Sequence, residues 1–174
     1  MTETEELVVL VDESGHPYAE MPKAAVHHLD TPLHLAFSCW IVDDAGRVLV
    51  TRRAAAKLTW PLAWTNSVCG HPAPGEPIVA AVRRRAAAEL GLSLMSTELV
   101  LPDFRYSARM ANGILENEVC PVYRAVVLAD AEMLPDPAEV AEWRWTSMAD
   151  LSRDVAADPE PFSPWMLAQL PLLS

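Results

Sequence analysis

The sequence predicts a mixed α/β or α+β fold in which a β-sheet packs against helices. Strand-like segments occur both before and after one Ala-rich helical segment in the middle of the chain. The 174 residues match the size of one ordinary domain, and 51% of them are hydrophobic, which is enough to form a core. The chain contains no internal repeat and no low-complexity segment. We therefore expect a single domain over residues 1–174.

Three apolar runs in the first third of the chain predict β-strands. They are LVVLVD (7–12), HLAFSCWIVD (34–43) and RVLVTR (47–52). The tetrapeptide DDAG separates the second run from the third and is typical of a tight turn. These two runs therefore predict a hairpin.

The segment PIVAAVRRRAAAEL (77–90) predicts the central helix, because Pro77 stands at its start and Gly91 just past its end. Two β-rich segments follow, at 114–128 and 139–146, with a loop rich in Pro and Asp between them. A short C-terminal helix is predicted from Ser163, as N-cap, and Pro164 at its first position.

Charge restricts the class of partner. The net charge of −11 argues against nucleic acid or an anionic membrane, because both require a broad basic face. Nine of the thirteen basic residues nevertheless lie between positions 47 and 109, where few acidic residues oppose them. This cluster is consistent with a site for a small anion or with an ordinary solvated face.

The protein is expected to be cytoplasmic. No run of about 18 apolar residues predicts a membrane span, and the start MTETEELVVL lacks the basic region of a secretory signal. Cys39, Cys69 and Cys120 are too few for a disulfide scaffold, so we expect free thiols.

Five side chains form a candidate metal site. Glu116 and Glu118 lie two apart in a predicted strand and so project to the same side, where their charges repel unless a cation, a shared proton or solvent compensates them. His27, His34 and His71 add three imidazoles. Five ligands exceed a closed four-ligand zinc site and indicate a six-coordinate Mn²⁺, Mg²⁺ or Zn²⁺.

The stretch from Gly70 to Leu92 resembles the Nudix box, a loop and helix that bind metal and diphosphate, in a degenerate form. Arg85 and Ala88 stand where the box has glutamates, and Glu89 is the one metal-binding carboxylate retained. Diphosphate hydrolysis is therefore not expected. Arg85 and Glu89 are four residues apart on a helix, which is also the spacing of an ordinary salt bridge.

Six motifs together resemble type I isopentenyl-diphosphate isomerase, a family within the Nudix superfamily. They are HHLDTPLHLAFS, VLVTRR, WPLAWTNSVCGHP, PDFRY, ENEVCPV and FSPWM, in that order. The resemblance implies a Nudix-like αβα sandwich, with a mixed β-sheet flanked by helices. It also implies a small-molecule isoprenoid diphosphate as substrate, with isopentenyl and dimethylallyl diphosphates interconverted.

The resemblance also implies roles for individual residues. Cys69 and Glu118 would be the two acid/base groups, with Tyr106 hydrogen-bonded to the catalytic carboxylate. Trp165 would line the hydrocarbon end of the site, and Glu89 would bind a second ion, Mg²⁺. The first metal would be held by His27, His34, His71, Glu116 and Glu118, and the diphosphate by Lys23, Arg53, Lys57 and Arg85. Cys39 and Cys120 are expected in the core, and His16 and His28 at the surface.

Two other functions are consistent with parts of the sequence. A Nudix hydrolase of another diphosphate would share the fold, but the residues at Arg85 and Ala88 argue against it. A non-catalytic, metal-stabilised binding module would leave the pair of Cys69 and Glu118 without a role.

Overall fold

The strand Phe37–Asp43 (β4) lies at the centre of the larger of two sheets in the computed structural model, which describes residues 6–173. This sheet has the order β12, β5, β4, β11, β8, with β6 paired to β5 and β7 to β4. Its β11 runs parallel to β4, whereas the other pairs are antiparallel, so the sheet is mixed as predicted. The bounds are Val48–Arg53 (β5), Trp64–Thr65 (β6), Val68–Gly70 (β7), Ser96–Leu101 (β8), Val122–Val127 (β11) and Val140–Thr146 (β12).

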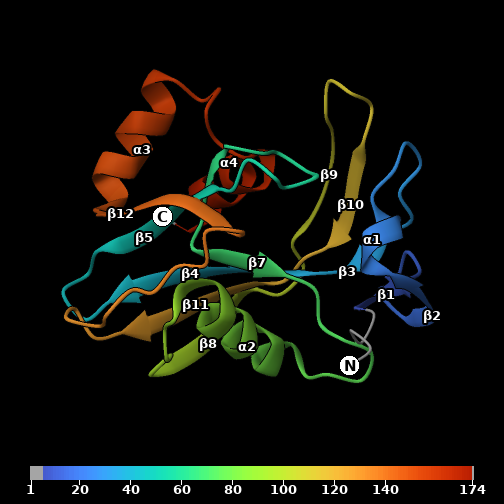
Figure 1. Ribbon diagram of the computed structural model, residues 1–174, viewed down its shortest axis with the longest axis horizontal. Coiled ribbons are helices and arrows are strands. Elements are labelled where there is room, and N and C mark those ends of the chain that lie inside the picture. Colours follow the sequence, from blue (N-terminus) through green and yellow to red (C-terminus); the bar gives the residue numbers. More distant parts are fainter. Residues whose placement is uncertain (1–5, 174) are drawn as a thin grey trace.

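A second, five-stranded sheet lies beside the first (Figure 1). Its order is β2, β1, β3, β10, β9, with β3 parallel to β10 and the other neighbours antiparallel. The short helix Lys23–Val26 (α1) follows β2. The strand bounds are Leu7–Val11 (β1), Pro17–Pro22 (β2), His34–Leu35 (β3), Arg105–Arg109 (β9) and Leu115–Val119 (β10).

Helices cover both faces of the larger sheet (Figure 1). The helix Ile78–Leu90 (α2) packs on one face, where Ile41 of β4 shares a core with Leu90. Met148–Ala157 (α3) and Pro164–Gln169 (α4) cover the other face, where Trp40 packs in a second core with Met166. Successive residues of β4 thus point into opposite cores, as the pleat of a strand requires. The predicted αβα sandwich is confirmed.

Two predicted strands are each divided between the two sheets. The run 34–43 breaks after Leu35, and the run 114–128 breaks before Val122. Pro121, which has no N–H to donate, lies in the second break. The two divided segments run parallel to each other in both sheets. Glu118 pairs with His34 in one sheet, and Val122 pairs with Ser38 in the other. This crossing from sheet to sheet positions the candidate site.

The helix ends follow the sequence with small differences. Helix α2 begins at Ile78, so Pro77 is its N-cap residue, and Gly91 closes it in the left-handed conformation with φ of 69°. Ser163 is the N-cap of α4 as predicted, but its hydroxyl bonds to Thr65 rather than to the helix.

Several elements were not predicted: α1, α3, β2 and β6 to β9. Most of β2 is exposed and β6 has two residues, so neither shows the apolar alternation that marks a strand. None of the helices in residues 6–173 is long and apolar enough to cross a membrane.

Candidate active site

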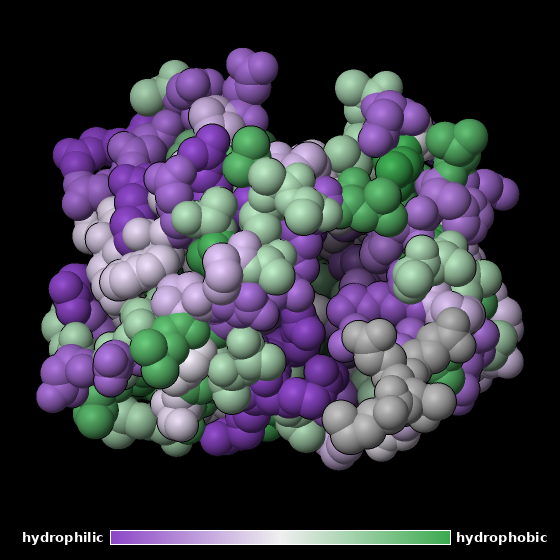
Figure 2. Space-filling view, in the orientation of Figure 1, coloured by the Kyte–Doolittle hydropathy of each residue, from purple (hydrophilic) through white to green (hydrophobic). Residues whose placement is uncertain are grey.

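A cavity of about 670 Å³ takes its walls from both sheets, from α1 and α2, and from α4. In Figure 2 this face of the molecule is hollowed near its middle, where mainly hydrophilic residues border the hollow. Eleven of the predicted site residues line the cavity: Lys23, His27, Arg53, Lys57, Cys69, His71, Arg85, Tyr106, Glu116, Glu118 and Trp165. The remaining two, His34 and Glu89, are buried and are not among the lining residues.

Glu118 lies at the centre of the predicted metal site. Its Oε1 atom is 3.2 Å from His71 Nε2, 3.4 Å from His34 Nε2 and 3.9 Å from His27 Nε2. These four residues offer ligand atoms that all lie within 4.8 Å of one another. They come from β10, the end of α1, β3 and the loop after β7, so segments distant in sequence meet at one point.

The ring nitrogens of this cluster match the requirements of a divalent cation. His27 Nε2 and His34 Nε2 face Glu118 and are buried without a hydrogen-bond partner, which is costly for a polar atom. His71 meets Glu118 through Nε2, and its other ring nitrogen, Nδ1, is the one without a partner. His34 Nδ1 lies 2.9 Å from Pro32 O, an acceptor, so this nitrogen carries a proton, and Nε2 offers a lone pair whenever the ring is neutral. Burial lowers the pKa of His34, but the Glu118 carboxylate raises it overall, so without a cation the pair favours a charged imidazole. Burial lowers the pKa of His71 to about 4, which keeps this imidazole neutral and able to bind metal.

Glu116 is held apart from the group of four. The Tyr106 hydroxyl donates to Glu116 Oε2 at 2.5 Å. Tyr106 was expected to bond the catalytic carboxylate, Glu118, but its partner in the structure is Glu116. The three imidazoles surround Glu118 and leave Glu116 facing the phenol. Burial, together with the charge of Glu118, raises the pKa of Glu116.

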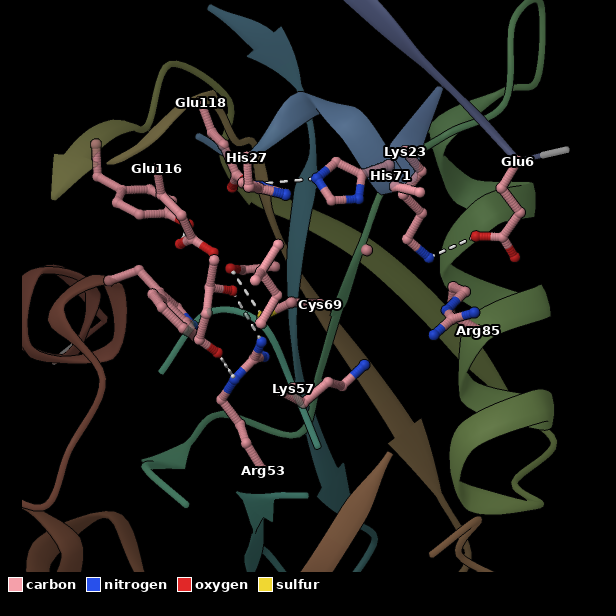
Figure 3. Close-up of a pocket in the computed structure, with 17 residues that line it drawn as sticks. Glu6, Lys23, His27, Arg53, Lys57, Cys69, His71, Arg85, Glu116 and Glu118 are labelled. Carbon is pink, nitrogen blue, oxygen red and sulfur yellow. Dashed lines mark hydrogen bonds and ion pairs between the residues drawn. The ribbon is translucent and has the colours of Figure 1, made fainter. Parts of the chain in front are cut away.

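Cys69 lies in the middle of the cavity, with Glu116 and Glu118 on one side and Lys57 on the other (Figure 3). Its thiol donates to Asn66 Oδ1 at 3.2 Å and lies 3.4 Å from Ser38 Oγ. Burial raises the pKa of Cys69 to about 11, so the group is a protonated thiol at neutral pH. As expected, Cys39 and Cys120 are buried, whereas His16 and His28 are exposed.

The four predicted anion-binding residues lie along one side of the cavity, and three of them are paired with glutamates. Lys23 Nζ lies 2.5 Å from Glu6 Oε2, and Lys57 contacts Glu139. Arg53 instead donates to Thr59 O at 3.0 Å. Glu6 and Glu139 were not predicted, because neither lies in a recognisable motif and each meets its partner through the tertiary fold.

Aromatic side chains form another part of the cavity wall, and one of the four cations reaches it. The ring of Trp165 lies 5.7 Å from the rings of Tyr106 and Trp60, between centroids. The Arg53 guanidinium lies over Trp165, 5.3 Å from the ring centroid. The cavity therefore has an aromatic end, which Arg53 also reaches, a cationic end with Lys23, Lys57 and Arg85, and titratable groups between them.

Comparison with known proteins agrees with this geometry. A model of the NUDIX domain matches residues 32–166. The isopentenyl-diphosphate Delta-isomerase of Clavibacter sepedonicus is 57% identical over 173 residues, which cover 99% of this chain and 90% of that protein. The protein of the same name from Paenarthrobacter aurescens (strain TC1) is 55% identical over 168 residues, covering 97% and 90% of the two chains. This chain belongs to the isopentenyl-diphosphate isomerase family.

Solved structures place this isomerase-family fold within the wider Nudix group. A MutT NUDIX hydrolase from Burkholderia pseudomallei superposes with a TM-score of 0.63 at 25% identity, covering 82% of this chain and 98% of its own. A MutT protein from Methanosarcina mazei Go1 gives a TM-score of 0.63 at 17% identity, covering 82% and 93%. The second comparison bears on the fold alone.

The Nudix helix of this isomerase-family chain carries an ion pair where a hydrolase box has further carboxylates. Arg85 lies 2.6 Å from Glu89 Oε1, so the salt bridge that their spacing allows is present, and 3.3 Å from Glu139 Oε1. Glu89 does not line the main cavity. It borders a space of about 30 Å³ together with Lys57, Cys69 and Glu139. Its predicted role as a ligand of Mg²⁺ stays a prediction.

Proposed function

We propose that this chain interconverts isopentenyl and dimethylallyl diphosphates by giving the substrate one proton and removing another. The observation that supports this most directly is the position of Cys69 and Glu118 in one cavity, between a cationic end and an aromatic end. A diphosphate suits the first end and a short hydrocarbon suits the second. We also propose that residues 1–174 act as one domain, since the cavity needs both sheets.

The reaction requires two acid/base groups. A proton added to the terminal carbon of isopentenyl diphosphate uses the electron pair of the double bond and leaves a tertiary carbocation. Loss of a proton from the neighbouring methylene returns an electron pair to the carbon chain as the new double bond. Cys69 and Glu118 divide these two tasks in our proposal, and the reverse reaction exchanges them.

The remaining residues bind, orient and shield the substrate. Lys23, Arg53, Lys57 and Arg85 would hold the diphosphate, with Glu6 and Glu139 releasing their cations as it enters. The face of Trp165 would stabilise a nearby cation by roughly 2 kcal/mol once water is excluded.

We propose that His27, His34, His71 and Glu118 hold a divalent cation, Mn²⁺, Mg²⁺ or Zn²⁺. Glu116, which bonds Tyr106 and lies outside this group of four in the structure, would be the fifth ligand. When bound, this ion supplies positive charge that compensates the two buried carboxylates. Glu89 would hold the second ion, Mg²⁺, near the diphosphate.

The test supplies isopentenyl diphosphate with Mg²⁺ and Mn²⁺ and follows dimethylallyl diphosphate and released phosphate together. Formation of the isomer without phosphate is the expected result. Phosphate release would identify a Nudix hydrolase instead, and no reaction would favour a binding module.

A further inference from the structure

The C-terminal helix is connected to Cys69 by a chain of buried hydrogen bonds. Trp40 Nε1 donates to Gln169 Oε1 at 2.8 Å, and Gln169 Nε2 donates to Ser38 Oγ at 2.9 Å. Ser38 Oγ lies 3.4 Å from Cys69 Sγ. The side chains of Gln169 and Ser38 are fully buried, so water does not compete for these bonds.

The indole of Trp40 fixes the direction of this chain. An indole N–H only donates, so it selects the oxygen of the Gln169 carboxamide and turns the NH₂ group toward Ser38. The Ser38 oxygen then accepts from Gln169, and its own hydrogen is left for another acceptor. Two sulfurs lie within reach of it, Cys69 at 3.4 Å and Cys120 at 3.5 Å.

A second indole fixes the thiol from the other side. Asn66 Oδ1 accepts from Trp165 Nε1 at 3.1 Å, from Thr65 Oγ1 at 3.0 Å and from Cys69 Sγ at 3.2 Å. Asn66 Nδ2 donates to Cys39 O at 2.9 Å, which confirms the orientation of this amide. Because the amide oxygen only accepts, the S–H of Cys69 points to Asn66, and the Cys69 sulfur is an acceptor toward Ser38.

We infer that Gln169 and Ser38 are positioning residues that direct the Ser38 hydroxyl at the Cys69 sulfur. The inference rests on the proposed function, in which Cys69 alternates between thiol and thiolate. When the thiol gives its proton to a substrate carbon, the electron pair stays on sulfur, and the Ser38 O–H stabilises it with a charge-assisted hydrogen bond. The C-terminal helix thereby contributes to proton transfer without touching the substrate.

The direct test measures kcat and KM for the interconversion in Ser38→Ala, Gln169→Leu and the double variant. Each single change is expected to lower kcat about tenfold and leave KM nearly unchanged, because a charge-assisted bond is lost only when the thiolate forms. The double variant should be no slower than Ser38→Ala, since both changes interrupt one chain. Ser38→Thr, which keeps the hydroxyl, should retain most of the wild-type kcat.

Two further variants separate positioning from folding. Ser67→Ala removes an equally buried serine whose hydroxyl bonds Leu49 O, at 2.7 Å, and not the thiol, so it should lower stability without lowering kcat. Trp40→Phe leaves Gln169 and Ser38 in place but frees the amide to turn, and should lower kcat in the same way as Gln169→Leu.

Several results would overturn the inference. They are an unchanged kcat in folded Ser38→Ala, additive losses in the double variant, or an equal loss of kcat in Ser67→Ala. A loss reproduced by Cys120→Ala would assign the Ser38 hydrogen to Cys120 instead. A wild-type protein that makes no dimethylallyl diphosphate would contradict the proposed function itself, so the wild-type activity is measured before that of any variant.

Discussion

At the scale of single residues, Lys57 shows how burial sets the charge of the cationic end. Desolvation, with Arg53 and Arg85 nearby, lowers the pKa of Lys57 to about 8, and the charge of Glu89 opposes the shift only in part. The ammonium form therefore dominates below that pH and is lost above it. A diphosphate site needs the charged form.

This shift predicts a pH dependence for substrate capture. We expect kcat/KM to fall as pH rises above about 8, because kcat/KM reports titration of the free enzyme. Lys57→Arg should keep its charge throughout this range and extend the plateau to higher pH. Rates measured from pH 6 to 10 check this, and an identical alkaline limb in Lys57→Arg would show that another group is responsible.

The residues that the sequence did not reveal share one property. Ser38 of β4, Asn66 just before β7 and Glu139 just before β12 contact site residues because the larger sheet brings these segments together. Ser38 and Asn66 lie within two of the quoted motifs, but no spacing of ligands or charges marks either of them, or Glu139, as part of the site. Glu116 and Glu118, by contrast, follow from strand alternation alone, and both are buried while Asn117 between them is less so.

At the scale of elements, the two ends of α2 were predictable, because Pro restricts the local backbone angles and Gly permits the left-handed ones. The division of 34–43 and 114–128 between two sheets was not, since an apolar run does not encode which partner each half will find. Pro121 marks the second break, yet a proline also fits the edge of one continuous strand.

The end of α2 makes a stability prediction. Gly91 has φ of 69°, and a Cβ added there would lie 2.7 Å from Leu134 Cβ. Gly91→Ala should lower the free energy of unfolding by about 1–3 kcal/mol through backbone strain and this contact. Gly46→Ala, with φ of 85° and no atom within 4 Å of the added Cβ, is the matched control and should cost less. If urea unfolding showed that both variants lose the same free energy of unfolding, the contact with Leu134 would contribute nothing to the cost.

At the scale of the whole molecule, the candidate metal ligands join the two sheets. Glu118 and His34 belong to the five-stranded sheet, whereas His71 follows β7 of the larger one. An ion bound by all of them would oppose separation of the sheets. Ligand binding to the folded state alone raises stability, by about 2.7 kcal/mol at one hundred times Kd.

Metal-free protein should therefore gain thermal stability when Mn²⁺ is added, and calorimetry should give about one bound ion at this site. His34→Ala should lose both the gain and the binding, because it removes a fully buried ligand. His28→Ala, which changes an exposed histidine outside the cluster, should keep both. Full Mn²⁺ binding by His34→Ala would contradict the ligand set.

Isomerisation in D₂O shows whether Cys69 and Glu118 move protons to and from carbon. Proton transfer by these two groups predicts one deuterium in the methyl group of each dimethylallyl diphosphate formed, with no covalent adduct on the thiol. It also predicts that Cys69→Ala, with its metal content unchanged, nearly abolishes both the rate and the labelling. Unlabelled product, or near-normal turnover by Cys69→Ala, would contradict it.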